Sequence, residues 1–239
     1  MFISELARPG DKIDITYLHQ NNGKVYKSSL FDIINDTEIE IGMPTDGGKM
    51  VLFQVGFEFE LSFFTQRGIY ICDGKVIGRY KKDNFYTMTV KMLSAPKKYQ
   101  RRDYYRVDCL IDFSYYKITE EVANLETTED LFDEIADPKY IPEKKFATTK
   151  DISGGGIRFV VGEDLEVNSY VLMVIKLSNE KIDQTFYLVA QMIACNPIQK
   201  KPDKRVARAR FIFKDPKDRD RIVRFVFEED RMMRKKVNG

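Results

Sequence analysis

The segment from Lys97 to Arg106, KKYQRRDYYR, separates two halves of the chain. Its ten residues include five cations and three tyrosines but a single carboxylate. Strand-like segments end near Pro96 on one side of it and resume at Arg106 on the other. The sequence therefore predicts two domains, 1–96 and 97–239, joined by a junction that grips an anionic ligand.

The composition limits what this ligand can be. Apolar residues make up 43% of the 239 residues, which is enough for folded cores. The 39 basic and 37 acidic residues leave a net charge of only +2, so any anion site must be local. No stretch approaches the ~18 uncharged apolar residues of a membrane span, and the start MFISELARPGDK does not resemble a signal peptide. We expect a cytoplasmic protein without membrane insertion.

Cysteine and histidine are sparse. Cys72, Cys109 and Cys195 are far apart and form no CxxC motif, which predicts reduced thiols in the cores. His19 is the single histidine and precedes a predicted turn at 20–23, so we expect a solvated turn residue. We therefore expect no metal site and no catalytic triad.

Alternating apolar and polar residues predict short antiparallel strands in both halves. In the first half, segments 13–17, 24–34, 39–41, 57–63, 70–80 and 86–92 show this pattern. Within 70–80, Asp73-Gly74 predicts a two-residue hairpin turn. Residues 43–48 predict a loop.

In the second half, the strand pattern occurs at 106–113, 148–160, 170–177, 185–194 and 205–213. A helix is predicted after Asp215-Pro216, with an apolar face formed by Ile222, Val223, Val226 and Phe227. Residues 117–147 interrupt the strands with an acidic insertion that contains a short helix capped by Thr128. The predicted fold is mainly β, with two small antiparallel barrels, a C-terminal helix and a helical insertion.

The glycine run in Asp151-Ile152-Ser153-Gly154-Gly155-Gly156 is unusual among strands. Glycine weakens a strand, so three in a row require a reason: a positive φ, or the close approach of a ligand or another backbone. Asp151 and Ser153 are two residues apart and are expected to point to the same side of an extended segment.

These residues can recognise guanine and phosphate together. The guanidinium groups of Arg102 and Arg106 can fork onto guanine O6 and N7, stack on a base or clamp a phosphate. The carboxylate of Asp151 can accept from the paired N1–H and N2–H donors of guanine. Each base contact contributes about 1–3 kcal/mol, so a few of them predict binding near micromolar, about −8 kcal/mol.

The two motifs, Arg102-x-x-x-Arg106 and Asp151-x-Ser153-x-x-Gly156, resemble the RxxxR and (D/N)xSxxG signature of the PilZ family of cyclic di-GMP receptors. The preceding domain, from Pro9-Gly10-Asp11 to Pro96, resembles that of YcgR-like flagellar brake proteins, an N-terminal split barrel before the PilZ barrel.

This resemblance implies a ligand, a set of contacts and a partner. The ligand is cyclic di-GMP, with no other cofactor, and it contacts Arg101, Arg102, Arg106, Asp151, Ser153, Gly154, Gly155 and Gly156. In the family, an arginine at the place of Arg101 is associated with two intercalated ligand molecules per chain. The implied partner is a flagellar motor stator or switch protein, which recruits the receptor to the flagellar basal body and slows motility.

Two features depart from the family pattern. The 44 residues between Arg106 and Asp151 exceed the usual gap because of the insertion at 117–147. Arg208 stands where many relatives carry a small residue, and it is a further candidate for a ligand contact. Both departures bear on partner choice more than on the signature.

Other functions are compatible with parts of the pattern. A cyclic di-GMP-responsive regulator of exopolysaccharide synthesis shares the same signature. Basic residues interleaved with tyrosines are also typical of single-stranded nucleic-acid binders, although the small net charge disfavours nucleic acid. A flavin-carrying split barrel would make the protein an enzyme. The first half, however, contains no nucleophile–base pair, phosphate loop or carboxylate dyad, and we expect a protein that is not an enzyme.

Overall fold

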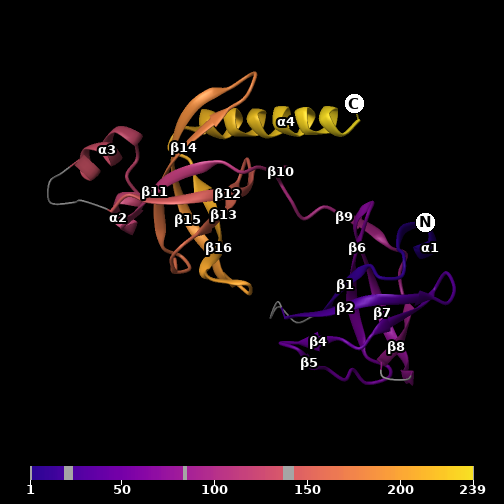
Figure 1. Ribbon diagram of the computed structural model, residues 1–239. Coiled ribbons are helices and arrows are strands. Elements are labelled where there is room, and N and C mark those ends of the chain that lie inside the picture. Colours follow the sequence, from indigo (N-terminus) through magenta and orange to yellow (C-terminus); the bar gives the residue numbers. More distant parts are fainter. Residues whose placement is uncertain (1, 19–23, 83–84, 137–142, 239) are drawn as a thin grey trace. The chain divides into compact units, whose positions relative to one another are not determined.

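The computed structural model describes residues 2–18, 24–82, 85–136 and 143–238. They form two compact units, Met1–Arg101 and Arg102–Gly239 (Figure 1). The predicted turn at 20–23 and its neighbour His19 lie outside the described residues.

The first unit is a closed antiparallel barrel. Its strands follow the order β1-β6-β7-β8-β3-β2, and β2 pairs back onto β1. They are β1 (Lys12–Tyr17), β2 (Val25–Ile33), β3 (Glu38–Gly42), β6 (Glu58–Thr65), β7 (Gly68–Lys82) and β8 (Phe85–Met92). Helix α1 (Ile3–Leu6) precedes the barrel, and β9 (Lys97–Tyr99) adds to β7. The first three residues of the basic segment therefore belong to this unit.

Alternation explains this core. Phe59, Leu61 and Phe63 on β6 are fully buried, while Glu58, Glu60 and Ser62 between them lie on the other side of the strand. The predicted loop at 43–48 instead contains part of a small hairpin, β4 (Thr45–Asp46) and β5 (Lys49–Met50). Its turn residues Gly47 and Gly48 have φ of +56° and +83°, which glycine adopts without strain.

The predicted hairpin turn at Asp73-Gly74 is wrong, because both residues lie within the continuous strand β7. Gly74 is required for a different reason. A Cβ there would lie 2.9 Å from side-chain atoms of Leu61 and of Val90, both buried in the barrel. The glycine makes room for its neighbours across the sheet, which local turn statistics cannot reveal.

The second unit is also a closed antiparallel barrel, of the order β12-β11-β14-β15-β16-β13, with β13 paired back onto β12. Its strands are β11 (Asp112–Ile118), β12 (Lys145–Ser153), β13 (Gly156–Val161), β14 (Tyr170–Ser178), β15 (Asp183–Ile198) and β16 (Lys201–Ile212), and β10 (Arg106–Asp108) adds to β12. The predicted mainly β fold with two small barrels is confirmed.

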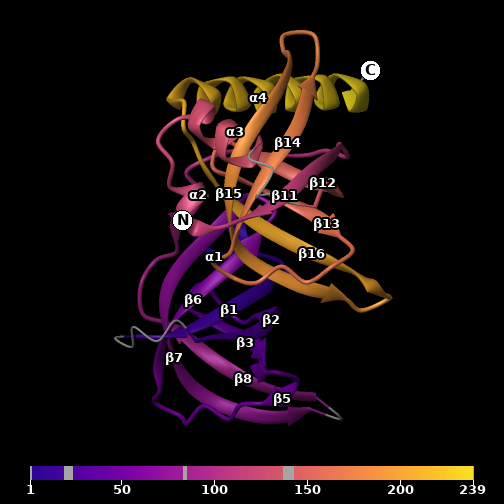
Figure 2. The same cartoon turned by 90° about the vertical axis from the view of Figure 1, so that its left-hand side faces the viewer.

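Helix α4 (Pro216–Asn238) lies along one end of the second barrel (Figure 2). The Asp215 carboxylate accepts from the Lys217 amide at 2.9 Å, as the predicted cap requires. Ile222 and Val226 enter the barrel core as predicted, but Phe225 joins them, whereas Phe227 stays 57% exposed. The apolar face of the helix is therefore rotated toward Phe225.

The predicted strand at 106–113 is interrupted between β10 and β11. Three residues, 109–111, oppose the two residues 149–150 of β12, so that Leu110 bulges outward and is 83% exposed. The buried hydroxyl of Thr149 spans the break: it donates to the Cys109 carbonyl at 2.6 Å and accepts from the Ile111 amide at 2.9 Å.

The insertion forms α2 (Glu120–Ala123) and α3 (Thr128–Ala136). The cap of α3 is Thr127 and not Thr128, because Thr127 and Asp130 exchange hydrogen bonds in a capping box. Val122, Ala123 and Leu131 pack with the strand residues Leu172 and Val189 in a small core of their own. The insertion is thus packed against the sheet through its apolar face.

Cys72, Cys109 and Cys195 are free thiols, and burial raises the pKa of Cys72 to about 12. Within the described ranges, no helix combines the length and apolar character that crossing a bilayer requires.

Candidate functional site

The two signature segments meet on adjacent strands of the second barrel. Strand β10 begins at Arg106 and pairs with the end of β12, so that Arg106 lies directly opposite Ser153 and Asp108 opposite Asp151. Val107 and Ile152, the residues between them, face the barrel core. The pleat therefore puts Arg106, Asp108, Asp151 and Ser153 together on the outer face.

Pairing continues this arrangement across two more strands. Asp151 lies opposite Arg158 of β13, which lies opposite Arg208 of β16. The row Asp108–Asp151–Arg158–Arg208 thus crosses the four strands on one face. In the parallel row, Arg106 is followed by Ser153, Gly156 and Arg210.

Asp151 is a buried carboxylate, with 8% of its side chain exposed. Its Oδ2 accepts a hydrogen bond from Nε of Arg158, and Nη2 of the same guanidinium lies 4.0 Å from Oδ1 of Asp108. A buried charge requires such a partner, because desolvation of an unpaired carboxylate is costly. The acid predicted to bind a ligand is therefore already paired with a cation of the chain.

The glycine run makes a tight hairpin. Gly154 and Gly155 form the turn between Ser153 of β12 and Gly156 of β13. The Ser153 hydroxyl donates to the Gly156 carbonyl at 3.1 Å and accepts from the Gly155 amide at 3.4 Å. Ser153 therefore fixes the turn from within, in addition to the ligand role expected from the sequence.

Close packing explains the three glycines, and none of them has a positive φ. A Cβ at Gly156 would lie 2.3 Å from the Ala209 carbonyl oxygen of β16. At Gly155 it would lie 2.9 Å from the ring of Tyr104, and at Gly154 2.4 Å from Val223 of α4. Of the two predicted reasons, positive φ is wrong, and the close approach is made by the chain itself.

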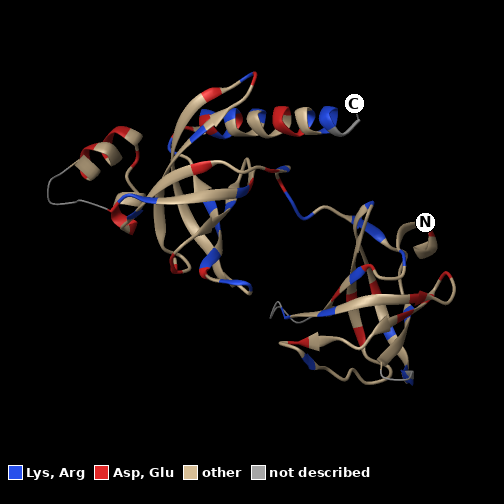
Figure 3. Cartoon of the chain, in the orientation of Figure 1, with Lys and Arg blue, Asp and Glu red and all other residues tan. Residues whose placement is uncertain are grey.

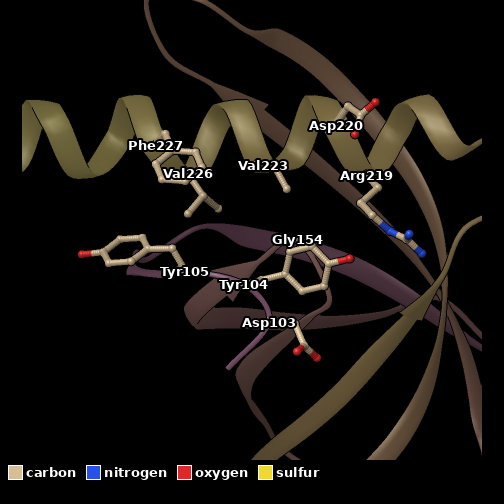
Figure 4. A pocket seen from close by; sticks show the side chains of 9 residues that line it. All are labelled: Asp103, Tyr104, Tyr105, Gly154, Arg219, Asp220, Val223, Val226 and Phe227. Atoms are coloured by element: carbon tan, nitrogen blue, oxygen red, sulfur yellow. The ribbon is translucent and has the colours of Figure 1, made fainter. Parts of the chain in front are cut away.

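Two tyrosines between the arginines attach their loop to the glycine turn of the barrel and to helix α4. Tyr104 packs on the glycine turn, while Tyr105 stacks on Phe227 with ring centroids 6.1 Å apart and donates to Asp230 at 2.8 Å (Figure 4). Both rings border a pocket of about 330 Å³ beside α4. The pocket is lined by Asp103, Tyr104, Tyr105, Gly154, Arg219, Asp220, Val223, Val226 and Phe227. The anchored tyrosines hold the loop, while Arg102 and Arg106 remain exposed at its ends.

The remaining predicted site residues lie as follows. Arg101 is the last residue of the first unit, where its guanidinium lies 5.1 Å from the ring centroid of Phe64. Arg208 lies in the row of Asp151 and is exposed. Strand β16 as a whole is rich in basic residues, whereas the helices of the insertion are acidic (Figure 3).

Sequence reasoning missed Arg158 and the anchoring role of the two tyrosines. The signal for Arg158 was available: a hairpin that turns at Gly154-Gly155 pairs residue 151 with residue 158. Among the described residues, no group of three or more His, Cys, Asp or Glu side chains is arranged to hold a metal ion.

Family models match both units. Residues 8–96 match the model described as flagellar protein YcgR, and residues 100–228 match the PilZ domain. The second match covers more than half of the chain, which therefore belongs to the PilZ domain family. A comparison with curated proteins found no match.

Solved structures with the same fold cover nearly the whole chain. The inhibitor of motility MotI/DgrA of Bacillus subtilis has a TM-score of 0.68 at 20% identity, covering 98% of this chain and 99% of its own. YcgR of Escherichia coli in complex with c-di-GMP has a TM-score of 0.55 at 15% identity, with 96% and 88% covered. MrkH, described as a c-di-GMP-dependent transcription regulatory factor, has a TM-score of 0.52 at 12% identity, with 91% and 83% covered.

Proposed function

We propose that the chain is a receptor for cyclic di-GMP, not an enzyme, and that it regulates flagellar motility. The observation that carries the proposal is the pairing of Arg106 with Ser153 and of Asp108 with Asp151, which joins the two signature segments on one face of the barrel. Membership in the PilZ family and the fold shared with YcgR and MotI/DgrA support the same ligand and process.

Each part of the ligand has a suitable partner on this face. The exposed arginines 102 and 106 can clamp phosphates or stack on a base, and Arg208 is a third candidate. Asp151 can read the paired donors of guanine N1–H and N2–H. The remaining contacts are assigned to Ser153, to the backbone of Gly154, Gly155 and Gly156, and to Arg101. Cyclic di-GMP carries both guanine and phosphate twice, which suits this combination.

In this proposal, the ligand acts as a switch between the two units. Arg101, Arg102 and Arg106 carry like charges on one short segment, and the ligand's phosphates neutralise them. The bound ligand then favours one arrangement of the units, which docks on a motor stator or switch protein at the flagellar basal body. The small-angle scattering curve should change when cyclic di-GMP is added. Superimposable curves at saturation would contradict the switch but not the binding of the ligand.

Two alternatives concern the output and the ligand. A receptor for the same ligand can instead regulate exopolysaccharide synthesis, and the two outputs differ in the partner recovered when cyclic di-GMP is present. A single-stranded nucleic-acid binder would use the same arginines and tyrosines for phosphates and base stacking. Asp151 is a buried carboxylate that can accept from the edge of guanine, which favours the dinucleotide over single-stranded nucleic acid as the ligand.

A competition experiment tests the ligand. Fluorescently labelled cyclic di-GMP is bound to the full chain, and fluorescence polarisation is followed as unlabelled cyclic di-GMP, cyclic di-AMP or single-stranded DNA is added. We expect only cyclic di-GMP to displace the label at micromolar concentrations. Displacement by DNA at similar nucleotide concentration, or no binding of the label, would contradict the proposed function.

A further inference from the structure

Arg158 already donates to the Asp151 carboxylate oxygen that a guanine edge would need as its acceptor. Its Nε donates to Oδ2 of Asp151, whose side chain is 8% exposed. A guanine that donates N1–H and N2–H to a carboxylate uses both oxygens. A guanidinium offers the same kind of paired, coplanar N–H donors, so Arg158 and guanine compete for one acceptor.

The surroundings hold Arg158 in this position and also offer it another. Arg208 lies directly opposite on β16, and like charges across a strand pair repel, which favours a side chain turned toward β12. On the far side of Asp151, Asp108 is 89% exposed and its Oδ1 lies only 4.0 Å from Nη2 of Arg158. Asp108 is therefore a second carboxylate close to the same guanidinium.

We infer that Arg158 determines specificity as an internal competitor of the ligand, an inference that depends on the proposed function. In the ligand-free chain, its guanidinium stands in for the guanine edge and keeps the Asp151 carboxylate buried, paired and correctly oriented. A ligand with paired donors displaces Arg158 toward Asp108. A base that presents an acceptor at the same place, as adenine does at N1, leaves the buried carboxylate without its partner and is rejected.

Titration calorimetry compares the full chain with Arg158→Met, at about 0.15 M salt so that distant charges are screened. The control is Arg205→Met, which removes another partly exposed arginine of the same barrel, one whose Nη2 lies 3.5 Å from Asp164. We expect Arg158→Met to bind cyclic di-GMP about three- to tenfold more tightly than the parent, and Arg205→Met to bind like the parent. Weaker binding by a folded Arg158→Met would overturn the inference.

A second measurement follows ligand binding to the parent chain and uses variants only for assignment and reference. The ¹⁵N signal of the Arg158 Nε–H, assigned by its loss in Arg158→Met, is followed in the parent chain, with Asp151→Asn as the reference for an arginine without its carboxylate. We expect cyclic di-GMP to move the signal toward the reference and cyclic di-AMP to leave it unchanged. A signal that stays in place at saturation with cyclic di-GMP would overturn the inference while leaving the proposed function intact. A parent chain that does not bind cyclic di-GMP would overturn both.

Discussion

The ring of Tyr104 packs against the backbone of Gly154 so closely that a Cβ at position 154 would lie 2.7 Å from the ring. Tyr104 belongs to the segment between the two signature arginines, and Gly154 belongs to the turn that follows Asp151 and Ser153. This contact joins the two halves of the candidate site through the protein's own atoms.

Gly154→Ala should separate them. The added methyl group meets both Tyr104 and Val223, so we expect the free energy of unfolding to fall by about 1–3 kcal/mol. Displacement of the loop should weaken cyclic di-GMP binding by about tenfold or more. Gly162→Ala is the control, because the nearest atom to a Cβ there is 4.0 Å away. Equal behaviour of the two variants would contradict the packing role.

Thr149→Val should destabilise the second unit. The valine fills the same space but leaves the Cys109 carbonyl and the Ile111 amide without the buried hydroxyl that bonds both. We expect a loss of about 1–3 kcal/mol in chemical denaturation. Thr148→Val removes a hydroxyl that bonds the exposed Asp112, and it should cost less. A smaller loss for Thr149→Val than for Thr148→Val would refute this account of the strand break.

Glu163 should make the free energy of unfolding depend on pH. Burial alone would raise its pKa, but hydrogen bonds from Lys117, Lys145 and Tyr115 outweigh burial and lower the pKa to about 2, from 4.5. A carboxyl group with a depressed pKa stabilises the fold above its unfolded pKa and loses this contribution as pH falls through the folded value.

Glu163→Gln should therefore lower the free energy of unfolding at pH 7 by about 2 kcal/mol, below the limit set by the full shift because the lysines are partly exposed. The difference from the parent should shrink between about pH 5 and pH 2. Denaturant titrations across this range measure it, with Glu143→Gln as a control, because that side chain is 79% exposed. A difference that does not vary with pH would show that the charge is not responsible.

Arg101 should set the number of ligands. We expect two cyclic di-GMP molecules per parent chain and a ratio near one for Arg101→Ala, because the lost guanidinium can no longer stack on the second ligand. Calorimetry gives the ratio directly. One ligand per parent chain would end this hypothesis without affecting the first ligand site.

Period-2 alternation predicted most strands because it records which face of each strand is buried, and burial is a local pattern. It could not predict pairing between strands. The sequence pair Asp73-Gly74 indicated a turn, but the glycine is required because Leu61 and Val90 on other strands leave no room for a side chain there. The strand break near Leu110 exists because this strand has one more residue than the facing part of β12. The burial of Phe225 depends on how α4 is rotated on the barrel.

The candidate site shows the same limit. Its motifs were visible in the sequence because family signatures are contiguous. The Arg158 ion pair became visible only with the register of the β12–β13 hairpin, and the anchoring of Tyr105 on Phe227 joins residues more than a hundred positions apart.

Titration calorimetry of cyclic di-GMP into the full chain measures whether the RxxxR arginines and Asp151 hold one ligand together. We expect a dissociation constant near micromolar for the parent and for Arg205→Ala, and an affinity lower by about tenfold or more for Arg102→Ala, Arg106→Ala and Asp151→Ala. No heat of binding at tens of micromolar ligand, or equal affinity of all four variants and the parent, would contradict it.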